Sequence, residues 1–370
     1  NGHTLDTTAC PSYFRAIEEE RTLSVRDAHI DPRTCEFSDS YFTPLGIIRR
    51  KTGQRHGDQF GPLLAHGGKV DPELRQLGDA ACLPGGIAFT TDSYVVDPLF
   101  FPGGDIGRLA VNGTVNDLVV SGAEPRFLSL AFILEEGLDA KVLDRVIRSI
   151  RGAAKAARVR VVTGDTKVVR RGQGDKIYIN TAGVGRSIAR PQPAKIKRGD
   201  KIILTGTLGD HSLAVMLARG DFGLRSSVRS DCAPLLFLLP FWKKGALWMR
   251  DVTRGGLATV LVELAENLRY PVLIEEDRIP LSRPVRAAGE LLGIDPLYMA
   301  CEGKAVVVAP ADKAEEFLRR MRRDPLGRQA AVIGEVQDKI GRPGELLLRT
   351  GVGGLRLLEP LTSELLPRIC

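Results

Sequence analysis

The 370-residue chain is 43% hydrophobic and 26% charged, so it is long enough for two packed domains and too apolar to be disordered throughout. Its 52 Lys and Arg against 45 Asp and Glu give a net charge of +7, but the basic residues are scattered and only 6% of residues are aromatic, which argues against nucleic-acid binding. No apolar run could cross a membrane, no secretory signal is visible and the six cysteines form no C-x-x-C pair, so we expect a soluble, cytoplasmic protein with reduced thiols.

The first 65 residues show weak hydrophobic periodicity, and no fold is predicted for them. A buried strand is predicted at residues 87–91, and apolar residues three and four positions apart predict an amphipathic helix over residues 138–156. Strands are also predicted at residues 159–163 and 176–180, where β-branched or alternating apolar residues occur. Strands and helices therefore alternate, which predicts an α/β protein of the α+β type.

A segment rich in Pro, Lys and Gly, residues 191–201, is the predicted linker to a second region of the same style. That region is expected to contain strands at 202–204, 305–308, 330–336 and 345–350, and helices at 210–219, 255–268 and 311–323. Prolines 360 and 367 oppose regular structure near the end of the chain. The last residues are therefore predicted to form a mobile arm that ends in Cys370.

Acidic turns occur where predicted strands end or helices begin, at Asp79, Asp92, Asp117 and Asp251. Convergent carboxylates suit Mg²⁺ shared with nucleotide phosphates, but any one of these aspartates, taken singly, is more often a helix cap or turn residue. Glycine-containing turns at residues 102–105, 164–167, 206–210 and 254–256 offer backbone amides near helix starts, where phosphates bind. There is no Walker or dinucleotide-binding motif, so ATP, if it binds, requires another architecture.

Cys370 is the last residue of the chain, and a cysteine on a movable arm can be presented to several sites in turn. The alternative is an accidental exposed thiol; prenylation is excluded because it needs the cysteine fourth from the end. Lys167 and Glu302 lie at predicted strand edges, where isolated charged residues more often form ion pairs. His211, at a predicted helix start, is assigned a structural role.

Six segments together carry a resemblance to a known family: residues 89–104, 113–117, 162–168, 206–211, 251–256 and the terminal Pro-Arg-Ile-Cys at 367–370. In order and spacing they resemble the HypE family of hydrogenase maturation factors, the carbamoyl dehydratases, within the aminoimidazole ribonucleotide synthetase (PurM-like) superfamily. The resemblance implies two PurM-like domains, at residues 66–190 and 195–350, between a divergent segment (1–65) and a tail (351–370). It also implies ATP bound in a cleft and a homodimer formed through strands of the first domain.

The resemblance further implies a reaction in which HypF supplies a carbamoyl group to Cys370 and ATP drives its dehydration to a thiocyanate. The cyanide then passes to iron on the HypC–HypD complex during [NiFe]-hydrogenase maturation. By resemblance, the Mg²⁺ ligands are Asp79, Asp92, Asp117 and Asp251; the ATP-binding residues are Asp92, Asn116, Asp117, Gly164, Asp165, Thr166 and Asp251; and the catalytic residues are Cys370, Lys167 and Glu302. Lys167 is expected beside the sulfur, where it would lower the thiol pKa, and Glu302 is a candidate base.

The chain departs from the family pattern in several places. Where the family has His-Gly-Ser-Gly-Gly, this chain has His66-Gly67-Gly68-Lys69, and Asn112 and Cys301 stand where the family often has cysteine and asparagine. Two alternative functions follow from the residues: another PurM-like ATP-dependent enzyme, of the selenophosphate synthetase or thiamine phosphate kinase type, or a non-catalytic thiol carrier with a damaged ATP site.

Overall fold

A computed structural model describes residues 78–220, 223, 226–361 and 368–370 of the chain. By contacts within the chain, residues 1–75 separate from residues 76–370. The predictions for residues 1–65 and for His66-Gly67-Gly68-Lys69 lie outside the described residues. Within the described part, no helix has the length and apolar character needed to span a membrane.

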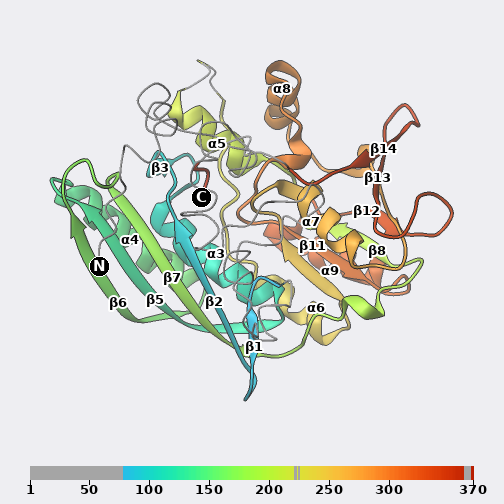
Figure 1. The fold of residues 1–370 in the computed structure, drawn as a ribbon, viewed down its shortest axis with the longest axis horizontal. Coiled ribbons are helices and arrows are strands. Elements are labelled where there is room, and N and C mark those ends of the chain that lie inside the picture. Colours follow the sequence, from blue (N-terminus) through green and yellow to red (C-terminus); the bar gives the residue numbers. More distant parts are fainter. Residues whose placement is uncertain (1–77, 221–222, 224–225, 362–367) are drawn as a thin grey trace, which may run out of the picture. The chain divides into compact units, whose positions relative to one another are not determined.

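The first sheet has five strands in the order β1-β2-β7-β5-β6, and only β5 and β6 run parallel (Figure 1). Its strands are β1 (Ala81–Leu83), β2 (Ile87–Tyr94), β5 (Ala123–Glu135), β6 (Arg160–Val169) and β7 (Ile177–Ser187). A short hairpin, β3 (Phe100–Phe101) and β4 (Gly104–Asp105), precedes helix α3 (Ile106–Val120), which packs with α4 (Ala140–Ala156). The helices cover one face only, because Ala88 and Thr90 of β2 are buried while their neighbours Ile87 and Phe89 are exposed.

The second sheet has seven strands in the order β14-β13-β10-β12-β8-β11-β9. They are β8 (Lys201–Leu204), β9 (Trp248–Asp251), β10 (Val272–Glu275), β11 (Ala305–Ala309), β12 (Ala331–Val336), β13 (Leu346–Arg349) and β14 (Leu355–Leu358). The accompanying α-helices are α5 (Asp210–Arg219), α6 (Leu239–Lys243), α7 (Gly256–Glu266), α8 (Arg283–Leu292) and α9 (Ala314–Met321). The 3₁₀ helices are η4 (Pro193–Lys195), η5 (Leu236–Leu238), η6 (Glu276–Arg278), η7 (Pro296–Tyr298) and η8 (Pro325–Gly327).

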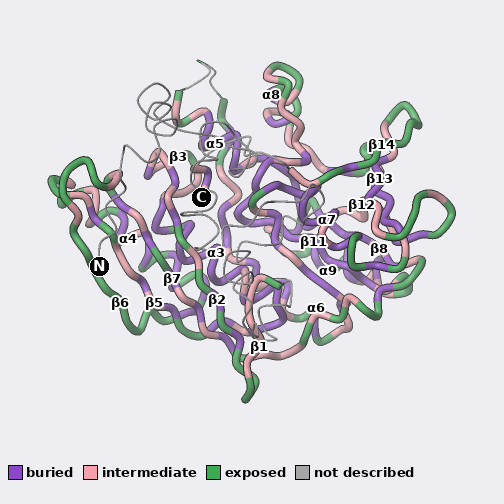
Figure 2. The backbone as a smooth tube through the Cα atoms, viewed as in Figure 1, coloured by how far each residue is buried: buried purple, intermediate pink, exposed green. Residues whose placement is uncertain are grey.

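Helix α3 is buried both by the region of the first sheet, to which it belongs, and by the region of the second sheet (Figure 2). Thirteen of its 15 residues are buried, and one apolar cluster joins residues such as Val111 of α3 to Phe317 of α9. The indole Nε1 of Trp242 on α6 donates a hydrogen bond to the carbonyl oxygen of Val119, at 2.8 Å. A helix that is buried on all sides lacks the 3.6-residue alternation of a surface helix, and the sequence analysis did not predict this one.

Several predicted elements are confirmed, including α5 at its predicted limits and α4, β6 and β7 with shifted ends. The glycine turn predicted at residues 164–167 is wrong, because these residues lie inside strand β6. A side chain at Gly164 would place its Cβ 2.3 Å from the carbonyl oxygen of Leu130, so this glycine permits close strand packing instead of a turn. Residues 355–358, which were assigned to the tail, form β14 and pair with β13.

Candidate active site

The four aspartates singled out in the sequence lie on different elements that meet at the second half of β2, around Thr90 and Asp92. Asp79 precedes β1, Asp92 is on β2, Asp117 is on α3 and Asp251 ends β9. The hydroxyl of Thr90 lies 2.8 Å from both Oδ2 of Asp117 and the backbone oxygen of Asp79. The structure therefore brings together side chains that are 172 positions apart in the sequence, counting from Asp79 to Asp251.

Burial raises the pKa of each of these carboxyl groups, and their mutual repulsion raises most of them further. For Asp117 the pKa is well above its usual value, first because of burial and then because of the charges of Asp251, Asp92 and Asp79. Burial and then Asp79 raise the pKa of Asp251 in the same way. A cluster of this kind is unfavourable when every member is ionised, so a bound cation would relieve it.

Two other groups partly offset this negative charge. The guanidinium of Arg250 pairs with Asp79 Oδ1 and with Glu263 Oε2, both at 3.0 Å. The hydroxyl of Tyr94 donates to Asp92 Oδ2 at 2.7 Å, which lowers the pKa of Asp92 against the larger effect of burial. Among the described residues, no three His, Cys, Asp or Glu side chains are arranged to hold a metal ion on their own.

The C-terminal residues lie alongside the chain that follows β2, next to β3 and α5 (Figure 1). The backbone nitrogens of Val95 and Asp97 donate to the backbone oxygens of Cys370 (3.1 Å) and Arg368 (3.3 Å). In return, Nε of Arg368 donates to the oxygen of Val95 at 2.9 Å. The last three residues therefore lie along residues 95–97, and Cys370 comes to lie just past the end of β2.

Side chains from helix α5 and from the loop before β7 hold this terminal segment in place. His211, at the start of α5, contacts the backbone oxygen of Ile369 through Nε2 at 2.8 Å. Arg219, at the end of α5, donates to the oxygen of Asp97 at 2.6 Å and also to the oxygen of Arg368. Arg368 in turn forms an ion pair with Asp175. None of these contacts was anticipated, because they depend on how distant loops meet.

The thiol of Cys370 lies in an acidic, buried environment. Burial, followed by the charge of Glu302, raises the pKa of the thiol to about 12, while Arg254 acts to lower it. Burial, followed by Asp251, also raises the pKa of Glu302 well above its usual value, and Glu302 Oε1 has no hydrogen-bond partner among the described residues. The predicted pair of Cys370 and Glu302 is therefore brought together.

Glu302 is held through its backbone. Its N–H donates to Asp231 Oδ1 at 3.0 Å, and its carbonyl oxygen accepts from Asn116 Nδ2 at 3.3 Å. Asn116 also donates to the oxygen of Ala233 and accepts from the nitrogen of Leu235, so its amide links α3 to the second half of the chain. This residue, predicted to bind ATP, positions Glu302 through contacts within the protein.

Lys167 and the neighbouring predicted ATP-binding residues, Gly164, Asp165 and Thr166, lie elsewhere in this chain. They are on the exposed edge strand β6, and the Lys167 amine pairs with Asp165 at 3.0 Å. The strand register places Gly164 on β6 level with Asp92 on β2. Strands β7 and β5 lie between them, so the two residues are three strand spacings apart, or about 14 Å. The expectation that Lys167 lowers the pKa of Cys370 is not met within one chain, where the pKa is raised by burial.

Comparison with known proteins agrees with this arrangement. Residues 77–187 match the family described as AIR synthase related protein, N-terminal domain, and residues 197–342 match the corresponding C-terminal domain. The carbamoyl dehydratase HypE of Rhodobacter capsulatus is 45% identical over 310 residues, which cover 81% of this chain and 90% of that protein.

Two solved structures are similar over nearly their whole length. A HypE in complex with ATP has a TM-score of 0.74 and 45% identity, and the match covers 81% of this chain and 92% of that one. A HypE–HypF complex contains a chain with a TM-score of 0.75 and 42% identity, covering 79% of this chain and 96% of that one. On this evidence the chain belongs to the HypE family of carbamoyl dehydratases.

Proposed function

We propose that this chain uses ATP to dehydrate a carbamoyl group carried on the sulfur of Cys370, leaving a thiocyanate. The observation that carries the proposal is the position of the terminal cysteine, whose thiol lies next to Glu302 and the aspartate cluster. A substrate on the protein's own last residue needs no separate binding pocket. ATP binding is supported by the ATP complex of a related HypE.

The raised thiol pKa favours a particular order of events. A thiolate at this position would be buried beside carboxylates, so the docked sulfur is stable only when it is neutral. A thiocarbamate is neutral, and so is a thiocyanate. We infer that Cys370 accepts its carbamoyl group away from this site and returns as the neutral thiocarbamate.

Glu302 is the proposed base for the reaction. The carbonyl oxygen of the thiocarbamate takes the γ-phosphoryl group with departure of ADP, which turns a poor leaving group into phosphate. Glu302 then accepts a proton from the nitrogen, the C–O bond breaks with release of phosphate, and loss of the second N–H proton completes the nitrile. A raised pKa suits a carboxylate that must accept a proton near neutral pH.

The aspartate cluster fits a magnesium ion that is shared with a nucleotide. Its ligands are hard oxygens, and repulsion among them favours a cation. Asp79, Asp92, Asp117 and Asp251 do not form a complete cage, which suits Mg²⁺, because this ion usually binds one or two carboxylates plus phosphate oxygens and water. When bound, Mg²⁺ would offset the charge on the transferred phosphoryl group.

Because Lys167 lies on edge strand β6, away from Cys370 of its own chain, it could take part in the reaction only if β6 reaches the active site of a second copy of the chain. Strand β6 is exposed along almost its whole length, and the uncovered face of the sheet carries Ile87, Phe89, Phe127 and Ile133 as exposed apolar side chains. Apolar surface of this kind is typical of an interface between subunits. We therefore propose a homodimer through this face, in which Lys167, Gly164, Asp165 and Thr166 serve the partner's site.

The carbamoyl donor and the cyanide acceptor are proteins in this proposal. A related HypE forms a complex with HypF, which supports HypF as the source of the carbamoyl group. By resemblance to the family, the HypC–HypD complex and its iron receive the cyanide. Both transfers require Cys370 to leave the position described here.

Intact mass spectrometry of the full-length protein tests the proposal. The protein is supplied with a carbamoyl donor and HypF, and its mass is measured before and after addition of Mg²⁺ and ATP. We expect one carbamoyl group on the C-terminal peptide, followed by loss of one water. Carbamoylation without loss of water would reject the dehydratase in favour of a carrier, and an unmodified Cys370 would reject both.

A further inference from the structure

A cavity of about 370 Å³ lies beyond the loop that supports Glu302. It is enclosed by the first turn of α3, residues 230–233, Lys304, and the segment around η8. The residues that matter for its chemistry are Arg108, Ser230, Asp231, Lys304, Arg328 and Gln329. Cavities of this volume are typical of small-molecule sites.

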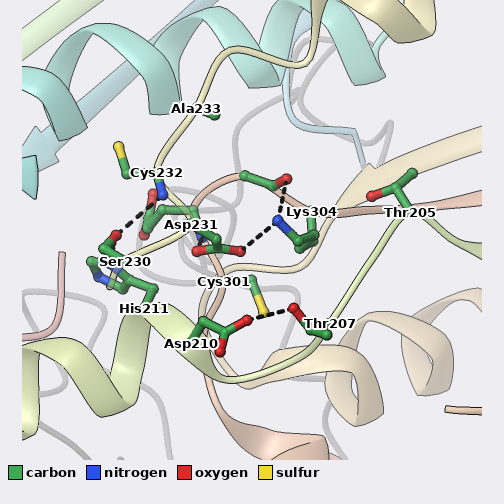
Figure 3. Close-up of polar contacts among 12 residues, drawn as sticks. Thr205, Thr207, Asp210, His211, Ser230, Asp231, Cys232, Ala233, Cys301 and Lys304 are labelled. Atoms are coloured by element: carbon green, nitrogen blue, oxygen red, sulfur yellow. Dashed lines mark hydrogen bonds and ion pairs between the residues drawn. The ribbon is translucent and has the colours of Figure 1, made fainter. Parts of the chain in front are cut away.

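The floor of the cavity carries a buried ion pair. Lys304 Nζ lies 3.3 Å from Asp231 Oδ2, and their side chains are only 9% and 5% exposed (Figure 3). Lys304 also donates to the oxygen of Gly303 at 3.3 Å. An ammonium group has three donors, so one remains for a ligand. Burial lowers the pKa of Lys304, but the neighbouring charges, led by that of Asp231, together exceed this effect, so the pKa is raised and the amine stays charged.

The mouth of the cavity carries two further cations. Arg108 donates from Nε to the oxygen of Cys232 at 3.1 Å, which orients its guanidinium, and the structure gives its terminal nitrogens no partner among the described residues. Arg328 is exposed and likewise has no carboxylate partner in the described part of the chain. With Lys304 balanced by Asp231, the two arginines leave the cavity with two unbalanced positive charges.

We propose that this cavity binds the phosphate group of a small molecule. Two unbalanced cations match the charge of a phosphate monoester, and guanidinium groups present paired donors that fit its oxygens. Gln329 adds an uncharged amide donor at the same cavity. The volume exceeds that of phosphate alone, so there is space for the organic part of a phosphorylated metabolite.

This site is distinct from the aspartate cluster, whose carboxylates would repel such a ligand in the absence of a metal ion. The two sites share a wall, because Asp231 contacts Lys304 in the cavity and accepts from the nitrogen of Glu302 on the other side. Ser230 also belongs to both regions: its Oγ lies 2.8 Å from Nδ1 of His211, the residue that contacts Ile369 (Figure 3). The inference stands on the cavity itself and does not require the proposed reaction.

Calorimetric titration of the full-length protein tests the proposal, with inorganic phosphate and glycerol 3-phosphate as ligands at constant ionic strength. Saturating Mg²⁺ and a non-hydrolysable ATP analogue keep the nucleotide site filled. We expect saturable binding that weakens about tenfold or more in R108Q/R328Q, because the variant loses hydrogen bonds from two charged groups to the phosphate. Tighter binding of the ester would identify a phosphorylated metabolite, and tighter binding of inorganic phosphate would identify free phosphate.

The matched control is R319Q/R323Q, which removes the same charge from exposed positions outside the cavity and should bind like the parent. The proposal is overturned if R108Q/R328Q binds as tightly as the parent, or if the control R319Q/R323Q binds as weakly as R108Q/R328Q. It is also overturned if neither ligand binds saturably once the ATP analogue is present, since any earlier binding would then belong to the nucleotide site.

Discussion

His211 contacts the backbone oxygen of Ile369 at 2.8 Å, one residue before the cysteine that carries the proposed chemistry. Burial lowers the pKa of His211, so the imidazole is neutral near pH 7, and its Nε2–H can donate to that oxygen. A histidine assigned only a structural role by its sequence context thus becomes a residue that positions the tail.

We expect H211A to loosen the docked tail without affecting nucleotide binding. Loss of one buried hydrogen bond costs about 1 kcal/mol, which corresponds to a roughly fivefold loss in the rate of ATP-dependent dehydration. Alkylation of Cys370 should become faster, because an undocked thiol has a lower pKa than the docked one. H211Q, which keeps a donor, should recover part of both effects; an unchanged alkylation rate in H211A would show that the contact does not hold the tail.

The aspartate cluster predicts how stability depends on pH. The pKa values of these groups are higher in the folded than in the unfolded protein, so the folded state binds more protons. Without nucleotide, stability should therefore increase as the pH falls from neutral toward the pKa of an unperturbed aspartate. Thermal melts across this pH range should show the increase, and saturating Mg²⁺ and ATP should remove it.

D117N should separate stability from function. Removing one negative charge from the cluster should stabilise the protein without nucleotide by about 1 kcal/mol, or ~2–4 °C, while weakening binding of Mg²⁺ and ATP. The exposed control D312N should change neither property. A melting temperature that falls in D117N would contradict the view that repulsion dominates this cluster.

The proposed dimer predicts complementation between two inactive variants. K167A retains Cys370, and C370A retains Lys167, so each homodimer alone should fail to form nitrile. If Lys167 serves the partner's site, mixed dimers contain one complete site, and random exchange of equal amounts should restore about one quarter of the wild-type activity. Exchange is verified by native mass spectrometry of differently tagged chains. Mixed dimers without activity would place Lys167 within its own chain's site, and an active K167A homodimer would place Lys167 outside the reaction.

The sequence predicted those elements and residues whose position is signalled by a local pattern, such as hydrophobic periodicity or an acidic residue at the end of an element. Helix α5 has its predicted limits, and the aspartates at the ends of elements converge as expected. Helix α3 carries no alternating pattern because both halves of the unit bury it, so periodicity could not reveal it. The contacts of Ile369 and Arg368, and the distance of Lys167 from the thiol, depend on chain segments that meet only in the folded protein.

E302Q provides the most direct test of the proposed base. The substitution keeps the size of the side chain but removes the carboxylate that would accept a proton from the thiocarbamate nitrogen. Loss of a general base lowers rates about 10²–10⁴-fold, so carbamoylated Cys370 should accumulate and persist after addition of Mg²⁺ and ATP. ATP binding should be retained, and the exposed control E315Q should dehydrate at the parent rate.

The same variant also tests the environment of the sulfur. Because the charge of Glu302 contributes to the raised pKa of the Cys370 thiol, that pKa should fall in E302Q. The pH dependence of Cys370 alkylation should therefore shift to lower pH in E302Q and remain unchanged in E315Q. Slow dehydration with an unshifted alkylation profile would indicate that Glu302 acts on the carbamoyl group from a position farther from the sulfur than the one described here.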